Sequence, residues 1–185
     1  GHTGTLDPLA TGLLPLCFGA ATKFSQASLD ADKRYLATLR LGQRTSTGDR
    51  EGEVVEERPV ATDLAAIVAA CARFTGAIDQ TPPMHSALKH EGKALYEYAR
   101  AGIDVERAAR RVTIHTIDII GWHDAELVLD VRCTKGTYIR TLAEDIGVAL
   151  GCGAHLAALR RTGSGALDVT QAVTLETLQR LSEAE

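Results

Sequence analysis

The chain has 185 residues, 45% of them hydrophobic, and a formal net charge of −4 at pH 7. This length favours one domain with a buried core, and no apolar run approaches the roughly 20 residues of a membrane helix. Residue 1 is not methionine, and the charged-then-apolar pattern of a signal peptide is missing. We therefore expect a fragment of a cytoplasmic protein without a membrane partner.

The net negative charge argues weakly against a nucleic-acid partner. Basic residues nevertheless gather locally, in 89–111, 132–140 and 159–165, and local patches set the field at a binding surface. The four cysteines share no close spacing, whereas zinc sites need paired ligands, so we expect no metal. Cys71 and Cys133 fall on apolar faces and are predicted to be buried thiols in a reducing compartment.

The chain opens with GHTGTLDPLATG, in which Asp7 is the first charged side chain and no other follows before Lys23. Pro8 pushes Asp7 into an extended backbone conformation, and Gly4 and Gly12 supply turn freedom on either side. The pattern predicts a short, stiff loop that presents one carboxylate. An ordinary Asp-Pro turn beside a strand is the alternative interpretation.

Further along, we predict a short helix over 21–32, a strand over 33–42, and a loop or hairpin over 46–58 that leads into an edge strand. Residues 62–76 form an amphipathic helix with an N-cap Thr or Asp, and it ends at Gly76. Its apolar side chains at helical spacing are Leu64, Ile67, Val68 and Cys71. Residues 81–88 are extended and stiffened by two prolines, and 93–102 form a helix that ends at Gly102.

Residues 110–120 and 126–133 are predicted strands of a hairpin, joined by 121–125. The second strand alternates cleanly, with Leu127, Leu129, Val131 and Cys133 on one face. A helix over 137–151 carries the apolar stripe Ile139, Leu142, Ile146 and Leu150. A strand over 154–165 and a helix over 174–181 follow. Because strands and helices mix without βαβ alternation, we predict an α+β fold with a mixed, mostly antiparallel sheet flanked by helices and loops.

Lys135 and Arg140 stand at the start of the helix over 137–151, where the helix dipole favours anions. Departures from local preference often mark functional sites, although a solvated pair of basic side chains is the alternative. A nearby aspartate or phosphate would resolve the conflict.

Five ordered motifs now make a family recognisable: GHTGTLDPLATGLLPLCFGAATK, DKRYLATLRLG, SALKHEGKALYEYARAGI, CTKGTYIRTLAEDIG and GAHLAALRRTGSG. Through essentially its whole length the chain resembles the TruB family, the bacterial tRNA pseudouridine-55 synthases. The resemblance implies conversion of one uridine in the T-loop of tRNA to its C-glycoside isomer, by a monomer that needs no cofactor and no metal. By motif position it makes Asp7 the catalytic aspartate, Arg140 its partner and Tyr35 the tyrosine stacked on the target ring.

The resemblance also places His2 in the space left by the extruded base, and Tyr138 and Leu159 in the lining of the uridine pocket. Residues 1–185 then form the catalytic domain, without the family's N-terminal Lys-Pro-x-Gly segment or its C-terminal RNA-binding domain. This departure from the family pattern puts two expectations in question, a complete set of strands in the sheet and a full affinity for tRNA. The insert over 83–111 is a candidate RNA-contacting lid, and a solvated amphipathic helix is the alternative.

The role of the carboxylate stays open, because an aspartate could attack C1′ or C6 or remove a proton from C2′. The guide-RNA-directed synthases of archaea and eukaryotes are a rival assignment. They are expected to lack the insert between SALK and ARRVTI, so no guide RNA is expected here. A second rival is an RNA-binding or tRNA-folding module that has lost its chemistry, and the intact Asp7, Tyr35 and Arg140 argue against that loss.

Overall fold

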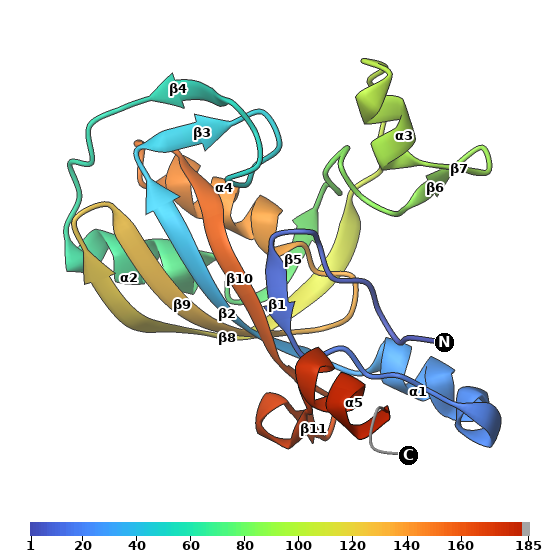
Figure 1. Ribbon diagram of the computed structural model, residues 1–185. Helices are drawn as coiled ribbons and strands as arrows, with labels where there is room; N and C mark the ends of the chain where they lie inside the picture. Colours follow the sequence, from blue (N-terminus) through green and yellow to red (C-terminus); the bar gives the residue numbers. More distant parts are fainter. Residues whose placement is uncertain (183–185) are drawn as a thin grey trace.

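A seven-stranded sheet forms the centre of the computed structural model, which describes residues 1–182 (Figure 1). The strand order is β1-β10-β2-β9-β8-β5, and β11 pairs with β10. The strands are β1 (Ala10–Gly12), β2 (Lys33–Leu41), β5 (Gly76–Gln80), β8 (Arg110–His123), β9 (Glu126–Cys133), β10 (Ala154–Ser164) and β11 (Leu167–Asp168). Every pairing is antiparallel except that of β1 with β10. The predicted α+β class and mostly antiparallel sheet are confirmed.

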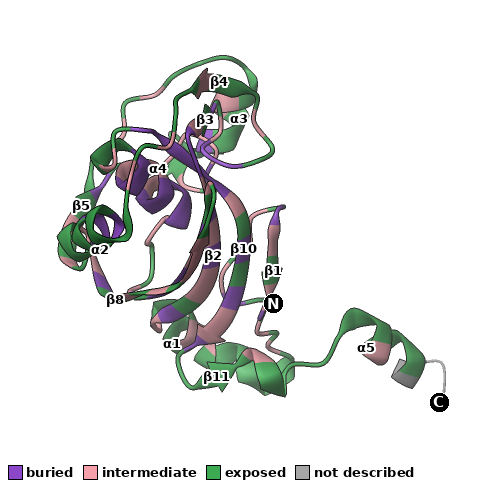
Figure 2. Cartoon of the chain, turned by 90° about the vertical axis from the view of Figure 1, so that its left-hand side faces the viewer, coloured by how far each residue is buried: buried purple, intermediate pink, exposed green. Residues whose placement is uncertain are grey.

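Two small hairpins and five α-helices surround this sheet. The hairpins are β3 (Gln43–Thr45) with β4 (Val54–Glu57), and β6 (Lys89–His90) with β7 (Lys93–Ala94). The helices are α1 (Ser25–Asp30), α2 (Leu64–Arg73), α3 (Leu95–Arg100), α4 (Ile139–Ala149) and α5 (Leu175–Ser182), with 3-10 turns η1 (Gly19–Phe24) and η2 (Val169–Gln171). Helix α5 extends away from the sheet (Figures 1 and 2). No helix in residues 1–182 is long and apolar enough to cross a membrane.

The hydrophobic core lies between one face of the sheet and the helices α2 and α4 (Figure 2). The predicted alternation of β9 is confirmed, since Leu127, Leu129, Val131 and Cys133 are all fully buried. The stripe of α4 meets them with Ile139, Leu142 and Ile146, while Leu150 is half-buried. Burying a Leu or Ile side chain contributes about 1.5–3 kcal/mol each, so this layer fixes the start of α4 against the sheet.

The predicted helix over 93–102 is shorter in the structure, because its first two residues form strand β7. Glu91 and Gly92 both have positive φ, at 50° and 85°, and they close a tight turn that pairs His90 with Lys93. Backbone pairing across this turn thus replaces the first helical turn. Residues 81–88, predicted to be extended, form no strand. The segment 46–58, predicted to lead into an edge strand, instead contains β4, which pairs with β3 outside the main sheet.

Two of the strands that were not expected from the sequence, β1 and β5, belong to the main sheet near the site. β1 lies inside the predicted Asp7 loop, and β5 begins at Gly76, the residue predicted to end a helix. Both are short, and each is stabilised by a distant partner, β10 for β1 and β8 for β5. Local composition therefore carries no signal for either strand.

Candidate active site

Asp7 lies in the turn that leads from Gly4 into β1. Its carbonyl oxygen accepts a hydrogen bond from the amide of Ala10 at 2.8 Å. Gly4 and Gly12 have φ of +91° and +98°, so the turn freedom predicted at both positions is used. At Gly12 a Cβ atom would also lie only 2.2 Å from the carbonyl oxygen of Arg161. The loop thus packs tightly on β10 and holds the Asp7 side chain at its turn.

Arg140, in the first turn of α4, is the partner of Asp7. Its Nη2 lies 2.9 Å from Asp7 Oδ2, and its Nη1 lies 3.6 Å from Asp49 Oδ2. The second cation at this helix start, Lys135, pairs with Asp30 at 2.6 Å. Carboxylates therefore supply the anions that the helix dipole favours at this position, and they explain the two basic residues there.

Asp49 is a site residue that the sequence analysis missed. Its side chain is 7% exposed, and its Oδ1 accepts hydrogen bonds from Thr47 Oγ1 at 2.7 Å and from the amide of Glu51 at 3.0 Å. These bonds hold the carboxylate in the β3–β4 connection so that it faces Arg140. In the sequence nothing separates Asp49 from the other acids of STGDREGEVVEE, because its role arises only when this hairpin packs against α4.

Backbone carbonyls complete the surroundings of the Arg140 guanidinium. Nη2 donates to the carbonyl oxygen of His85 at 2.6 Å, and Nη1 to that of Thr47 at 3.5 Å. A planar guanidinium with several donors can satisfy such a set at once. Arg140 thereby joins the Asp7 loop, the β3–β4 connection and the segment after β5.

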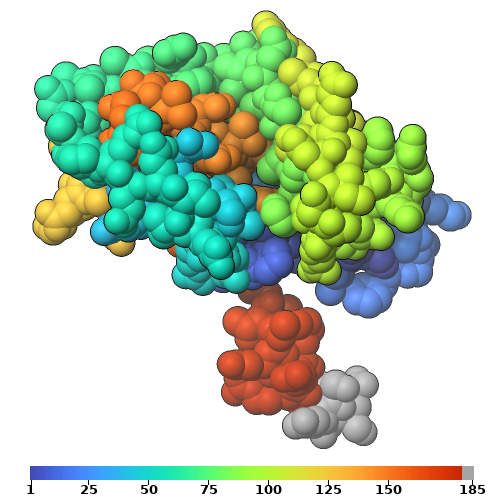
Figure 3. Space-filling model, turned by 90° about the horizontal axis from the view of Figure 1, so that it is seen from above, coloured from blue at the N-terminus to red at the C-terminus, as the bar shows by residue number. Residues whose placement is uncertain are grey.

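Two cavities meet at the Asp7–Arg140 pair. The smaller, about 110 Å³, is lined by Thr5, Leu6, Asp7, Ala10, Tyr35, Thr137, Tyr138, Ile139, Arg140 and Leu159. The larger, about 500 Å³, shares Asp7 and Arg140 with it and is lined on its far side by His85, Ser86, Tyr96 and Arg100. Figure 3 shows the surface hollowed between the N-terminal segment, the β3–β4 region and the insert. Five of the six residues predicted for the site line the smaller cavity.

The two tyrosines of the smaller cavity are held by the sheet. Tyr35 lies on β2 between Val131 and Arg161 of the neighbouring strands, and burial raises its pKa above the ordinary value. Tyr138 is clamped by Gln80 of β5, which donates to its carbonyl at 3.2 Å and accepts from its amide at 2.9 Å. Burial raises the pKa of Tyr138 as well. Both rings therefore carry neutral hydroxyls at pH 7.

His2 is the one predicted site residue that the structure does not bring to either cavity. It is exposed and forms an isolated backbone bridge with Leu16. In the part of the chain that the structure describes, no group of His, Cys, Asp and Glu is arranged to hold a metal ion. Burial raises the pKa of Cys71 to about 11 and that of Cys133 to about 12, so both are the buried thiols that were predicted.

The chain is similar to known proteins over its whole length. The sequence model of the TruB family pseudouridylate synthase N-terminal domain matches residues 1–139, and that of the tRNA pseudouridylate synthase B C-terminal domain matches 140–185. The tRNA pseudouridine synthase B of Cupriavidus pinatubonensis is 68% identical over 95% of this chain and 57% of that protein. The Ralstonia nicotianae protein of the same name is 67% identical over 99% of this chain and 60% of its own length. The chain thus spans less than two thirds of these relatives.

Among solved structures, a Cbf5-Nop10-Gar1 complex superposes with a TM-score of 0.71 at 32% identity, covering 95% of this chain and 44% of the other. An H/ACA RNP bound to a substrate RNA containing 2′-deoxyuridine superposes with a TM-score of 0.67 at 28% identity, covering 95% and 42%. The fold, the site and the matched models define the class of this protein as a pseudouridylate synthase domain. Within that class, the chain belongs to the TruB family.

Proposed function

We propose that this domain isomerises uridine 55 in the T-loop of tRNA to pseudouridine, in the cytoplasm and without a guide RNA. One observation carries the proposal: the Asp7 carboxylate, paired with a buried arginine, opens into a small cavity walled by Tyr35, Tyr138 and Leu159. An anion beside a small cavity walled by two aromatic rings and a leucine suits a reaction on a flipped nucleobase. The names of the relatives at 67–68% identity support tRNA as the substrate and pseudouridine as the product.

The isomerisation must break the N1–C1′ glycosidic bond, turn the freed uracil and join its C5 to C1′. C5 loses its proton to solvent and N1 gains one, so the atoms and charge balance. Asp7 is the group placed to act on the sugar or on the ring, and Arg140 fixes its direction, because a guanidinium fork matches carboxylate oxygens. The neutral hydroxyl of Tyr35 is placed to relay the C5 proton.

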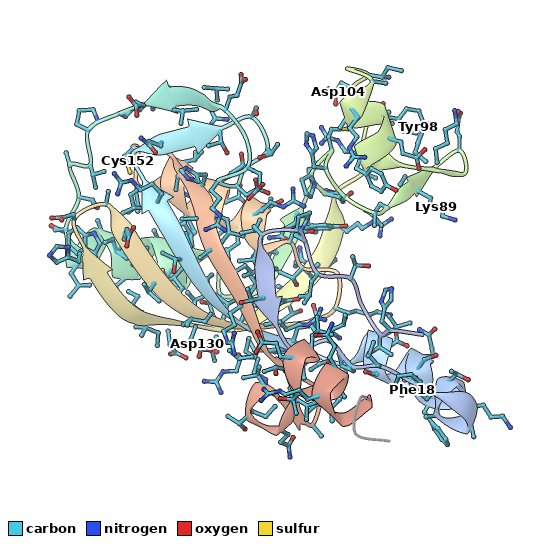
Figure 4. The ribbon with its side chains drawn as sticks, in the orientation of Figure 1. Phe18, Lys89, Tyr98, Asp104, Asp130 and Cys152 are labelled. Atoms are coloured by element: carbon cyan, nitrogen blue, oxygen red, sulfur yellow. The ribbon has the colours of Figure 1, made fainter. Side chains whose placement is uncertain are left out.

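The target base must leave its stack before it can enter the cavity, at a cost of a few kcal/mol. His2 is exposed in the N-terminal segment. Its ring is proposed to fill the space that the base leaves in the RNA. The insert over 83–111 is proposed to contact the loop RNA. It carries the hairpin β6–β7 and α3 beside the sheet, with Lys89 and Tyr98 displayed on it (Figure 4). Its Tyr96 and Arg100 line the larger cavity, as expected where stacking and charge recognise loop RNA.

Release of tritium from unmodified tRNA labelled at C5 of uridine tests the proposal directly. We expect release with the tRNA alone, without any guide RNA, and none from the same tRNA with cytidine at position 55. An inactive domain would contradict the catalytic assignment. Equal release from the two tRNAs would contradict the position, and activity only with a guide RNA would favour the H/ACA type of enzyme.

A further inference from the structure

Arg161 is the largest of the fully buried side chains, at 2% exposure, although it carries a permanent charge. It lies near the C-terminal end of β10. Within residues 1–182, no carboxylate comes within ion-pair distance of its guanidinium. Burying a charge is costly unless the group is paired or hydrogen-bonded. The partners of Arg161 should therefore show what this buried charge is for.

These partners are backbone carbonyls at both ends of the Asp7 loop. Arg161 Nε donates to the carbonyl oxygen of Leu13 at 2.7 Å, where the loop ends. Nη1 and Nη2 point to the carbonyl oxygens of Thr5 and Gly4 at 3.4 and 3.5 Å, where the loop begins. The amide of Leu13 also donates to the carbonyl oxygen of Arg161 at 2.8 Å. One residue thus closes the base of the loop from both sides.

Few other hydrogen bonds hold the rest of the loop, although β1 pairs with β10 and Leu9 packs into the core. Strand β1 has only three residues, and the turn at Asp7 is closed by its single bond to Ala10. Arg161 does not itself line the smaller cavity, but it lies close enough to the side chain of Tyr35, which does, to act on its hydroxyl. It does stand opposite Tyr35 in the strand register. Arg161 therefore connects the loop that carries Asp7 to strand β2, which carries the ring of Tyr35.

We propose that Arg161 is a positioning residue, whose guanidinium fixes the Asp7 loop so that the carboxylate faces Arg140 and the cavity. The proposal rests on the proposed pseudouridine synthesis for its kinetic consequences. Arg140 acts on the carboxylate itself, whereas Arg161 acts on the backbone that carries it. Loss of Arg161 should therefore lower the chemical rate while leaving the RNA-contacting surface in place.

The test compares Arg161→Met and Arg161→Lys with the wild-type chain. Arg160→Met is the matched control, because Arg160 is the exposed neighbour on the same strand. Single-turnover rates at saturating enzyme are measured beside tRNA dissociation constants and Tm. Since a displacement of about 1 Å can cost on the order of 10²-fold in rate, we expect a loss of that order for Arg161→Met with a nearly unchanged dissociation constant. Arg161→Lys should recover part of it, because an ammonium can still reach the carbonyl of Leu13.

Amide hydrogen exchange of the peptide over 4–13 is the second measurement, and it needs no activity. We expect faster exchange there in Arg161→Met, and wild-type exchange in Arg160→Met. If the wild-type chain releases no tritium, the proposed function fails, while faster exchange confined to 4–13 still supports the loop assignment. A Met variant with a lower Tm but wild-type rate and wild-type exchange over 4–13 would overturn the proposal. Equal losses of rate and affinity would overturn it too, because Arg161 would then act on RNA binding.

Discussion

Arg140 and Asp7 form an ion pair whose two sides face different surroundings. The guanidinium side chain is 4% exposed, whereas the carboxylate side chain is 37% exposed and borders both cavities. Charges attract more strongly where water is excluded, so the buried guanidinium of Arg140 fixes the orientation of the Asp7 carboxylate. The anion nevertheless remains open to a ligand. This asymmetry is what a carboxylate needs in order to be both fixed and reactive.

Replacing Asp7 with asparagine is expected to abolish turnover while largely preserving tRNA binding. Asparagine keeps the size and hydrogen bonding of the side chain but removes the negative charge that acts as nucleophile or base. Tritium release and filter binding with the same tRNA measure the two properties. Multiple turnover by Asp7→Asn would show that the carboxylate is not catalytic.

Replacing Arg140 with lysine is expected to lower the rate much more than the affinity for tRNA. Lysine keeps the charge but cannot face Asp7 and Asp49 at once with a planar fork. Arg140→Met should in addition destabilise the fold by about 3–5 kcal/mol, because it leaves the buried Asp49 without its cation. Single-turnover kinetics and urea unfolding check these outcomes.

Lys135→Met is the matched control for Arg140, since it removes the other cation at the same helix start, whose pair with Asp30 is exposed. Exposed pairs contribute little because solvent screens their charges, so the stability of this variant should hardly change. Equal losses of stability in Lys135→Met and Arg140→Met would contradict the inference that removing a buried cation costs more than removing an exposed one.

Tyr35→Phe is expected to keep tRNA binding and bond cleavage but to stall the loss of the C5 proton. Proton transfer contributes about 10²–10⁴-fold in rate, whereas stacking of a base contributes roughly 1–3 kcal/mol. Tyr35→Leu should lose base capture as well. Because burial raises the pKa of Tyr35, the wild-type hydroxyl stays protonated through neutral pH, and the role proposed for it is that of a relay and not of a phenolate base.

Single-turnover assays that score trapped intermediate separately from product distinguish the roles of Tyr35. A Phe variant with wild-type kinetics would leave stacking as the sole role of the ring. Two variants that melt at lower temperature with unchanged kinetics would make Tyr35 an ordinary core residue.

Gly12→Ala is expected to destabilise the fold by about 1–3 kcal/mol, the cost of a strained backbone conformation. Its φ is +98°, and the new Cβ would lie 2.2 Å from the carbonyl oxygen of Arg161. Gly121→Ala is the control, because that glycine has open space around it and should change stability by less than about 0.5 kcal/mol. Urea unfolding gives both values, and a neutral Gly12→Ala would contradict the close packing of β1 on β10.

Asp145→Asn is expected to raise the Tm at pH 7 and to have less effect as the pH falls toward 4. Burial raises the pKa of Asp145 in the folded state, so folding disfavours its ionised form. That penalty is absent below the unfolded pKa of about 3.9, develops as the pH rises through the folded pKa, and is complete above it. Thermal unfolding from pH 4 to 7 checks the sign. A constant difference in Tm across this range would contradict it.

Short-range patterns in the sequence were enough for the sheet class and for most elements, whereas the pairing of Asp7 with Arg140 was implied by the resemblance to the TruB family. The conflict between Arg140 and its helix dipole left two interpretations, a solvated cation or a cation with an aspartate or phosphate nearby, and the structure shows carboxylates there. Asp49, Gln80 and Arg161 carried no such signal. Each acquires its role through a contact with a segment far away in the chain: α4 for Asp49, the residue before α4 for Gln80, and the Asp7 loop for Arg161. His2 differs again, since its predicted role depends on RNA.

The parallel pairing of β1 with β10 has a consequence for synthesis of the protein on the ribosome. Ala10 pairs with Leu159, so the loop that carries Asp7 cannot dock until β10 has emerged. At translation rates of about 5–20 residues per second, that delay is roughly 7–30 s. During this time the first segment has no strand to join. The carboxylate therefore reaches its working position only late in the life of the nascent chain, when most of the sheet exists to receive it.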